Sequence, residues 1–403
     1  MFNFNLNVLN KIGLVSILCS ALMACSATDD EENDPTLAAE LTEINETFSP
    51  KVIWEKSVGD GVNNYFSRLK PAIAYGKVFS ASRMGDVYAF DTQTGKKIWH
   101  VNLSKNNSDS GFFSSGKSAL LAGGPTTGIN KLFIGSENGD VYALDADDGS
   151  IAWQGQVKGE VISAPAIDNG MLVVNSASGI LKAFNASDGQ EIWQVEQDVP
   201  ALTLRGISAP VLAGGGAIVG ASDGTLTVYI LETGQQGWTA EIGEASGSTE
   251  LERVIDIDSK PLIYRDKVYA ISAKGHLIAL DLRSGRVLWK RQYSSFRQLS
   301  MNGNTLYLTD IKGHIYAIDR SNGLERWSQL LLTNRGVTGP AVLEKHVVVG
   351  DFEGYLHWLD QETGEIVARY EVDSSGVFST PTVAKDILYV QSRDGDLQAI
   401  ATP

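Results

Sequence analysis

Histidine and cysteine are the side chains of this chain best suited to nucleophilic, redox or metal chemistry, and both are scarce. The 403 residues include five histidines and two cysteines. No His-Glu-x-x-His, Gly-x-Ser-x-Gly or phosphate-binding Gly-x-x-x-x-Gly-Lys-Ser/Thr motif occurs. His276 and His314 occupy the same position in successive copies of a repeat, which indicates a strand residue at the surface. The sequence therefore predicts a protein that is not an enzyme.

Cys25 stands in a context that predicts covalent lipidation. Lys11 precedes the short apolar run 12–19, and Leu22-Met23-Ala24-Cys25 follows. A basic end, a short apolar stretch and small residues before a cleavage site are typical of a secretory signal peptide. The Leu-x-Ala-Cys ending resembles a bacterial lipobox, which implies that residues 1–24 are removed and that Cys25 carries diacylglycerol and an N-acyl chain. Ser26 follows where lipoproteins retained in the inner membrane commonly carry Asp, so we expect the outer membrane.

Residues 25–50 are predicted to be a flexible tether behind this lipidated cysteine. The part from Ser26 to Pro50 contains eight acidic residues and no Lys or Arg. Like charge and low hydrophobicity favour disorder. The whole chain has a formal net charge of −15, which argues against nucleic acid as a partner.

Two interruptions of the repeat carry residues suited to binding a protein partner. In 198–206, Leu202 and Leu204 alternate onto one face, with Arg205 beside them. In 251–261, one connection later, Asp256 and Asp258 share a face because side chains alternate along an extended chain. Apolar anchors, an Arg and paired carboxylates make a plausible binding patch, although they also fit ordinary residues of an inner rim.

A third interruption, residues 104–128, carries Phe112 and Phe113 among Ser, Asn and Gly. This insertion is predicted to be either a binding tip or a loop folded back over its own repeat.

The elements that position these residues are copies of one repeat. In seven copies a glycine opens a pattern that ends fourteen positions later, and six of the seven ends are tryptophan. An eighth copy opens at Gly395 and is cut short by the end of the chain, whereas 52–55 has the same ending without an opening glycine. We expect these tryptophans to pack against the next repeat and donate their indole N–H to its backbone. They are Trp54, Trp99, Trp153, Trp193, Trp238, Trp289 and Trp327, with Ala368 in the seventh copy.

Each full copy contains four short apolar runs separated by turn-forming pairs, as in 162–167, 171–175, 180–184 and 191–195. A repeat of 40 to 50 residues is typical of propellers and solenoids. The incomplete copies at the two ends complement each other, which favours a closed ring. The sequence predicts an all-β, eight-bladed β-propeller over residues 51–403, with four antiparallel strands per blade and an N-terminal strand that closes the last blade.

The repeat pattern Ala-x-Asp-x-x-Thr-Gly-x-x-x-Trp resembles the docking motif of pyrroloquinoline-quinone (PQQ) dehydrogenases, which are also eight-bladed propellers. A periplasmic quinoprotein dehydrogenase is thus the alternative function, beside another kind of propeller binding module. Such enzymes use adjacent cysteines over the quinone, and often a Cys-x-x-Cys-His haem segment. This chain offers no cysteine for either purpose, because Cys19 lies in the predicted signal peptide and Cys25 is the predicted lipidation site. No bound cofactor is expected.

The lipobox, the acidic tether, the eight repeats and the two segments 202–210 and 253–258 together resemble the BamB family, the propeller lipoproteins of the β-barrel assembly (BAM) machinery. The resemblance covers essentially the whole mature chain. It implies a non-catalytic scaffold that docks on the periplasmic POTRA domains of BamA and assists the folding and insertion of β-barrel proteins.

The resemblance also implies roles for individual residues. Leu202, Leu204 and Arg205 would fill and pair with BamA, while Asp256 and Asp258 would contact BamA or fix Arg205. Unfolded outer-membrane proteins are possible further partners, through pairing with the outer strands. The implied location is the periplasmic face of the outer membrane, through the lipid anchor.

Overall fold

Short strands with buried apolar positions dominate the chain in the computed structural model. The structure describes residues 36–104, 118–200, 202–203, 207–243 and 255–402. Residues 1–38 and 39–403 form separate units, and every strand lies in the second unit. All 32 regular elements in the described residues are β-strands, which confirms the all-β prediction.

The strands form eight separate four-stranded antiparallel sheets, which we call blades. Blade 1 contains β2 (Ala72–Ala74), β3 (Lys77–Ala81), β4 (Asp86–Asp91) and β5 (Lys97–Asn102). Blade 2 contains β6 (Leu121–Gly128), β7 (Lys131–Ser136), β8 (Asp140–Asp145) and β9 (Ile151–Gln156). Blade 3 contains β10 (Ala166–Asp168), β11 (Met171–Asn175), β12 (Ile180–Asn185) and β13 (Glu191–Glu196). Blade 4 contains β14 (Val211–Ala213), β15 (Gly216–Gly220), β16 (Thr225–Ile230) and β17 (Gln236–Glu241).

The second half of the chain repeats this arrangement. Blade 5 contains β18 (Leu262–Tyr264), β19 (Lys267–Ile271), β20 (His276–Asp281) and β21 (Val287–Gln292). Blade 6 contains β22 (Ser300–Asn302), β23 (Thr305–Thr309), β24 (Ile315–Asp319) and β25 (Glu325–Gln329). Blade 7 contains β26 (Ala341–Leu343), β27 (His346–Gly350), β28 (Tyr355–Asp360) and β29 (Ile366–Glu371). Blade 8 contains β30 (Thr382–Ala384), β31 (Ile387–Gln391), β32 (Asp396–Ala401) and β1 (Lys51–Ser57).

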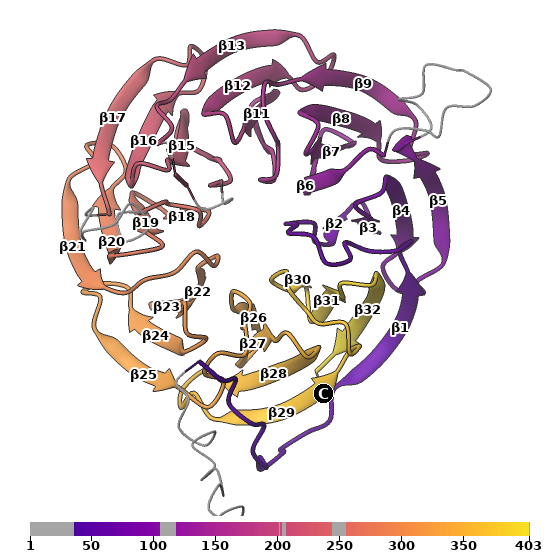
Figure 1. The fold of residues 1–403 in the computed structure, drawn as a ribbon, viewed down its shortest axis with the longest axis vertical. Coiled ribbons are helices and arrows are strands. Elements are labelled where there is room, and N and C mark those ends of the chain that lie inside the picture. Colours follow the sequence, from indigo (N-terminus) through magenta and orange to yellow (C-terminus); the bar gives the residue numbers. More distant parts are fainter. Residues whose placement is uncertain (1–35, 105–117, 201, 204–206, 244–254, 403) are drawn as a thin grey trace, which may run out of the picture. The chain divides into compact units, whose positions relative to one another are not determined.

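The blades form a ring with the first strand of each blade innermost (Figure 1). First strands of most neighbouring blades are in contact, including β2 with β30 where the ring closes. Strand β1 is the outer strand of blade 8 and pairs antiparallel with β32, from Lys51 opposite Ala401 to Ser57 opposite Asp396. This pairing confirms that the N-terminal strand completes the last blade.

The antiparallel order gives the ring two different faces. Within a blade the chain reverses at every strand end, so the turns between first and second strands and between third and fourth strands lie on one face. The turns between second and third strands lie on the other face, together with the connections from one blade to the next. We call this second side the connection face. The segments 198–206 and 251–261 are connections of this kind.

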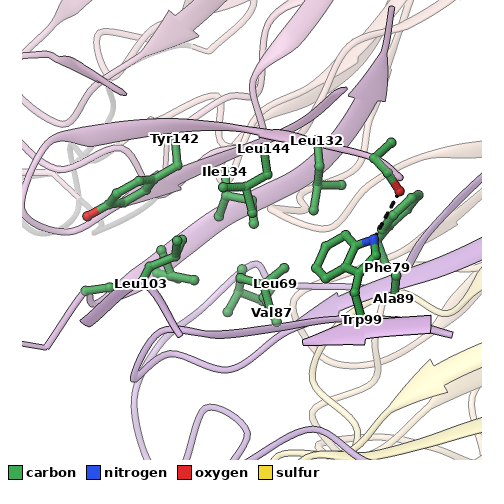
Figure 2. Close-up of a cluster of buried hydrophobic side chains, with 14 residues drawn as sticks. Leu69, Phe79, Val87, Ala89, Trp99, Leu103, Leu132, Ile134, Tyr142 and Leu144 are labelled. Carbon is green, nitrogen blue, oxygen red and sulfur yellow. Dashed lines mark hydrogen bonds between the residues drawn. The ribbon is translucent and has the colours of Figure 1, made fainter. Parts of the chain in front are cut away.

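The core consists of apolar side chains packed between adjacent blades. Figure 2 shows the cluster between blades 1 and 2, in which Phe79, Val87 and Trp99 lie against Leu132 and Leu144. Each blade therefore covers one apolar face of its neighbour, which a single repeat cannot do for itself.

The repeated tryptophans bind the following blade in the predicted way. The Nε1 of Trp99 donates a hydrogen bond of 3.1 Å to the carbonyl of Ala146 (Figure 2), and the other six indoles bond to equivalent carbonyls. Each ring also covers a turn glycine of the next blade. A Cβ on Gly149 would stand 2.7 Å from Cε3 of Trp99, and the six equivalent glycines are comparably close to their tryptophans. In blades 1 to 7 the turn glycine thus packs against the tryptophan of the blade before it.

The missing tryptophan of the seventh repeat has a structural reason. A tryptophan at position 368 on β29 would face the turn between the third and outer strands of blade 8, but blade 8 has no such turn because its outer strand is β1. Trp358 lies opposite Ala368 on the neighbouring strand, where most other blades have alanine. It is fully buried, and its Nε1 donates to Oγ1 of Thr402 at 3.1 Å. Blade 7 thus keeps its tryptophan, moved by one strand.

Part of the predicted tether lies against blades 6 and 7. The N–H of Ala39 donates to the carbonyl of Thr333, and the N–H of Thr47 donates to the carbonyl of Val367. Leu41 and Ile44 pack against the apolar cluster between blades 6 and 7. Phe48 packs edge-on to Trp358 at 6.4 Å between ring centroids. These contacts place residues 39–50 on the propeller, so a flexible tether is left as a prediction for residues 25–38.

Candidate functional site

The predicted partner-binding residues belong to the two connections that join blade 3 to blade 4 and blade 4 to blade 5. Leu202, Asp256 and Asp258 are described by the structure. Leu204 and Arg205 lie in 204–206, outside the described residues, as do Cys25 and the insertion residues Phe112 and Phe113. The structure therefore defines the geometry of the flanks of the two connections.

The first connection presents apolar side chains to solvent. Leu202 is 45% exposed and Val199 is 41% exposed. Thr203 and Val199 border a hollow of about 150 Å³, whose opposite wall includes Ser222 and Asp258. The hollow thus lies between the two predicted segments.

The second connection differs from the sequence prediction. Alternation along 255–258 predicts both carboxylates on one side and both isoleucines on the other. No strand forms there, and all four side chains are buried, Asp256 at 0% and Asp258 at 3% exposure. The N–H of Ile257 donates to the carbonyl of Ala221 in blade 4, and the carbonyl of Asp256 accepts from the N–H of Ala273 in blade 5. The segment is covered on both sides because it is wedged between two blades.

Arg68 ties the two connections together. Its Nη1 donates to the carbonyl of Ile207 at 2.9 Å and to the carbonyl of Asp258 at 2.7 Å. Arg68 precedes β2 of blade 1, and blade 5 is four places away in a ring of eight, so its side chain reaches across the centre. A second link runs from Oγ of Ser208 to the carbonyl of Ser259 at 3.1 Å. The backbones that flank both predicted segments are therefore fixed relative to each other.

The surroundings of the Asp258 side chain disfavour its ionised form. Burial raises the pKa of Asp258 to about 6, and the positive charge of Arg68 opposes only part of that shift. Burial in turn lowers the pKa of the Arg68 guanidinium, while Asp258 raises it. A carboxylate with a raised pKa pays a desolvation cost when ionised, which an additional positive charge would offset.

Sequence reasoning did not find Arg68. Its neighbourhood, Ser67-Arg68-Leu69-Lys70, carries no motif, and its partners are 139 and 190 residues away. The only available signal was that a basic residue precedes the first inner strand, which is not enough to predict a bond across a ring.

Three of the five histidines, His100, His314 and His357, each lie within salt-bridge distance of an aspartate away from this site. His357 is fully buried, with Nε2 3.0 Å from Oδ2 of Asp351, and Nε of Arg335 lies 2.8 Å from the same oxygen. Burial lowers the pKa of His357. A group with no solvent access cannot meet a substrate, so this triad holds blade 7 together.

Within the described residues, no three His, Cys, Asp or Glu side chains are grouped as metal ligands. No helix in the same residues has the length and apolar character needed to cross a bilayer.

The fold and the repeat place the chain in a recognisable class. It is an eight-bladed propeller of PQQ-like repeats, and the same architecture occurs in the quinohemoprotein alcohol dehydrogenase of Comamonas testosteroni. That structure has a TM-score of 0.68 at 14% identity, covering 90% of this chain and 78% of that one, which shows a shared fold and nothing more.

Closer matches define the family within this class. A family model described as outer membrane protein assembly factor BamB matches residues 38–123, 83–329 and 332–402. The outer membrane protein assembly factor BamB of Shewanella oneidensis is 44% identical over 382 residues, covering 95% of this chain and 96% of that protein. The crystal structure of BamB from Moraxella catarrhalis has a TM-score of 0.77 at 24% identity and covers 88% of this chain and 100% of that one. The chain belongs to the BamB family of outer membrane protein assembly factors.

Proposed function

We propose that this protein is a lipid-anchored, non-catalytic scaffold that docks on the POTRA domains of BamA through the connections 198–206 and 251–261. Leu202, Leu204 and Arg205 would make the contact, with Leu202 and Leu204 as apolar anchors and Arg205 as a hydrogen-bonding partner for a BamA carboxylate or carbonyl. The observation that carries the proposal is that Arg68 and Ser208 hold the flanks of both connections together beside an exposed Leu202.

The two carboxylates receive a positioning role in this proposal. Asp256 and Asp258 are buried, so BamA cannot reach them without movement of the connections. Asp258 lies where a positive charge offsets its desolvation, and Arg68 supplies only part of that charge. We infer that Asp256 and Asp258 fix the connection that supports the docking residues.

The lipid anchor would determine where in the cell envelope the protein lies. Acylation of Cys25 would hold the chain on the periplasmic face of the outer membrane, because several buried acyl chains bind a bilayer firmly. Residues 25–38 would link the anchor to Ala39, whose N–H is bonded to the carbonyl of Thr333 on the propeller. At about 3.3 Å per residue, these 14 residues span at most about 46 Å. Incorporation of radiolabelled palmitate, lost in Cys25→Ala, tests the anchor.

Co-purification of BamA from detergent-solubilised envelopes tests the docking face. We expect wild type to retain BamA, and Leu204→Ala/Arg205→Ala and Asp256→Ala/Asp258→Ala to lose it while remaining folded by circular dichroism. The matched control is Leu324→Ala/Arg326→Ala, which removes an exposed Leu and an Arg at the start of β25, on the opposite face. Equal retention in all variants would exclude these connections as the interface, and absence of BamA from wild type would refute the proposal.

The outer strands favour a second role, in binding unfolded clients. Strands β5, β9 and β13 are last in their sheets, and Ile98, Ile151 and Ile192 on them are exposed. An unpaired strand edge beside apolar side chains can accept an extended peptide by β-augmentation. A photo-crosslinker at Ile98 should capture client peptides in envelopes. Capture confined to a crosslinker at Leu202 would count against this role.

A further inference from the structure

Four cationic side chains come together near the centre of the ring, in a protein whose net charge is −15. Arg68 and Lys70 precede β2, Lys260 precedes β18, and Arg297 precedes β22, so they approach from blades 1, 5 and 6. We call them the axial cations. Because the first strand of each blade is innermost (Figure 1), the segments that lead into these strands also lie toward the centre.

Hydrogen bonds across the ring show that the axial cations are close to one another. Nζ of Lys70 donates to Oε1 of Gln298 in blade 6 at 3.1 Å, next to Arg297. Arg68 reaches the carbonyl of Asp258, two residues before Lys260. Arg297 donates through Nη2 to the carbonyl of Gly336 at 3.2 Å. Hydrogen bonds to residues of a different blade therefore hold each of these three side chains in position.

Their hydrogen-bond partners are neutral, so the four positive charges are offset only in part, by the carboxylate of Asp258 beside Arg68. The acceptors are backbone carbonyls and one amide oxygen. Among the residues that the structure describes, no axial cation forms a salt bridge. Asp258 is the one described carboxylate that acts on Arg68, and burial raises its own pKa to about 6. Neutral dipoles satisfy donors without neutralising charge.

Burial and the neighbouring positive charges both make the protonated forms of these side chains less stable. Burial and the charge of Lys260 lower the pKa of Lys70 to about 8, and burial and the charge of Arg68 lower the pKa of Arg297 to about 10. Lys260 is exposed and the other three are half-buried, so solutes can reach the group. A cluster of like charges with low-dielectric walls concentrates oppositely charged solutes.

We propose that the axial cations form a binding site for a small multivalent oxyanion, of the phosphate or polycarboxylate type. Arg68 and Arg297 would supply forked donors and Lys70 and Lys260 point charges, which is the combination that binds such anions. The site is separate from the exposed docking residues, although Arg68 contacts the backbone behind them. An occupied site would stabilise the cross-ring links on which the connections depend.

Isothermal titration calorimetry with inorganic phosphate and, separately, citrate tests this site on the full mature protein in a chloride buffer. We expect saturable binding at pH 7 of one or both anions, and the anion that binds identifies the type. Lys70→Met or Arg297→Gln should weaken it about tenfold or more, since charge-assisted hydrogen bonds are strong. Lys97→Met, which removes an exposed lysine from outer strand β5, should leave it unchanged.

The pH dependence gives a second readout. Affinity for citrate, whose carboxyl groups are already ionised there, should fall as pH rises through about 8, because Lys70 then loses its proton, whereas Arg68 and Arg297 stay charged and Asp258 is already ionised. Burial also lowers the pKa of Lys260, so loss of its proton would act in the same direction. If Lys70→Met does not fold, Lys260→Met serves instead, because that side chain is exposed. Absence of saturable binding to wild type, an equal loss in Lys97→Met, or a pH-independent affinity would each overturn the proposal.

Discussion

Replacing Asp258 by asparagine should stabilise the protein at neutral pH. Burial raises the pKa of this carboxyl from 3.8 to about 6. The folded state therefore binds the proton more tightly than the unfolded state, so the stability contributed by the protonated form is present below about pH 4. It is lost as pH rises towards about 6. A difference of about two pKa units corresponds to about 3 kcal/mol at pH 7.

Asparagine has nearly the same shape and carries no charge at any pH, so it avoids this loss. We expect Asp258→Asn to exceed wild type in free energy of unfolding by up to about 3 kcal/mol at pH 7.5, and to differ little at pH 4. Urea unfolding at both pH values, followed by tryptophan fluorescence, measures the difference. Asp266→Asn is the matched control, because Asp266 is exposed in a turn of the same blade.

Two results would refute this reasoning. An Asp258→Asn variant that is less stable than wild type at pH 7.5 would mean that Arg68 stabilises the carboxylate by more than burial costs. A difference that does not change with pH would mean that ionisation is not involved. If Asp258→Asn is more stable than wild type and also fails to co-purify BamA, the carboxylate of Asp258 lowers stability but is needed for docking.

The packing of the blades supports three further predictions. Gly364→Ala should lower the free energy of unfolding by about 1 to 3 kcal/mol more than Gly303→Ala in urea unfolding, because both glycines have positive φ but only Gly364 lies against Trp327, where an added Cβ would stand 2.5 Å from the ring. Trp358→Ala should cost about 3 to 5 kcal/mol by the same measurement, as expected for a large, fully buried aromatic side chain. Arg68→Met should cost about 2 to 4 kcal/mol and also weaken BamA co-purification, because it leaves two buried carbonyls without their donor; retention of wild-type BamA levels would show that the cross-ring link does not support docking.

The repeat made most of the fold predictable. A glycine and a tryptophan fourteen positions apart mark the third and outer strands of each blade, and the unmatched ends at 52–55 and Gly395 predicted closure by the N-terminal strand. These are local signals, since turns and strand alternation depend on neighbouring residues. They recur often enough to fix the number of blades.

Burial at the candidate site could not be predicted in the same way. Alternation placed Asp256 and Asp258 on one side and their isoleucine neighbours on the other, as it would for a strand with one free face. The connection instead lies between blades 4 and 5, which cover it on both sides. Whether a connection is covered depends on the two blades that flank it, and periodicity carries no information about that.

The class of fold, the closure of the ring and the candidate docking segments can be predicted from the amino-acid sequence, because each rests on a repeated or local pattern. Which residues meet across the ring is known from the folded structure alone. Arg68 bonds to Ile207 and Asp258 over long separations, and Trp358 replaces the tryptophan missing at position 368 because blade 8 lacks the turn that would receive it. Such contacts depend on where the ring closes and which blades face one another. They are properties of the assembled ring, which no single repeat contains.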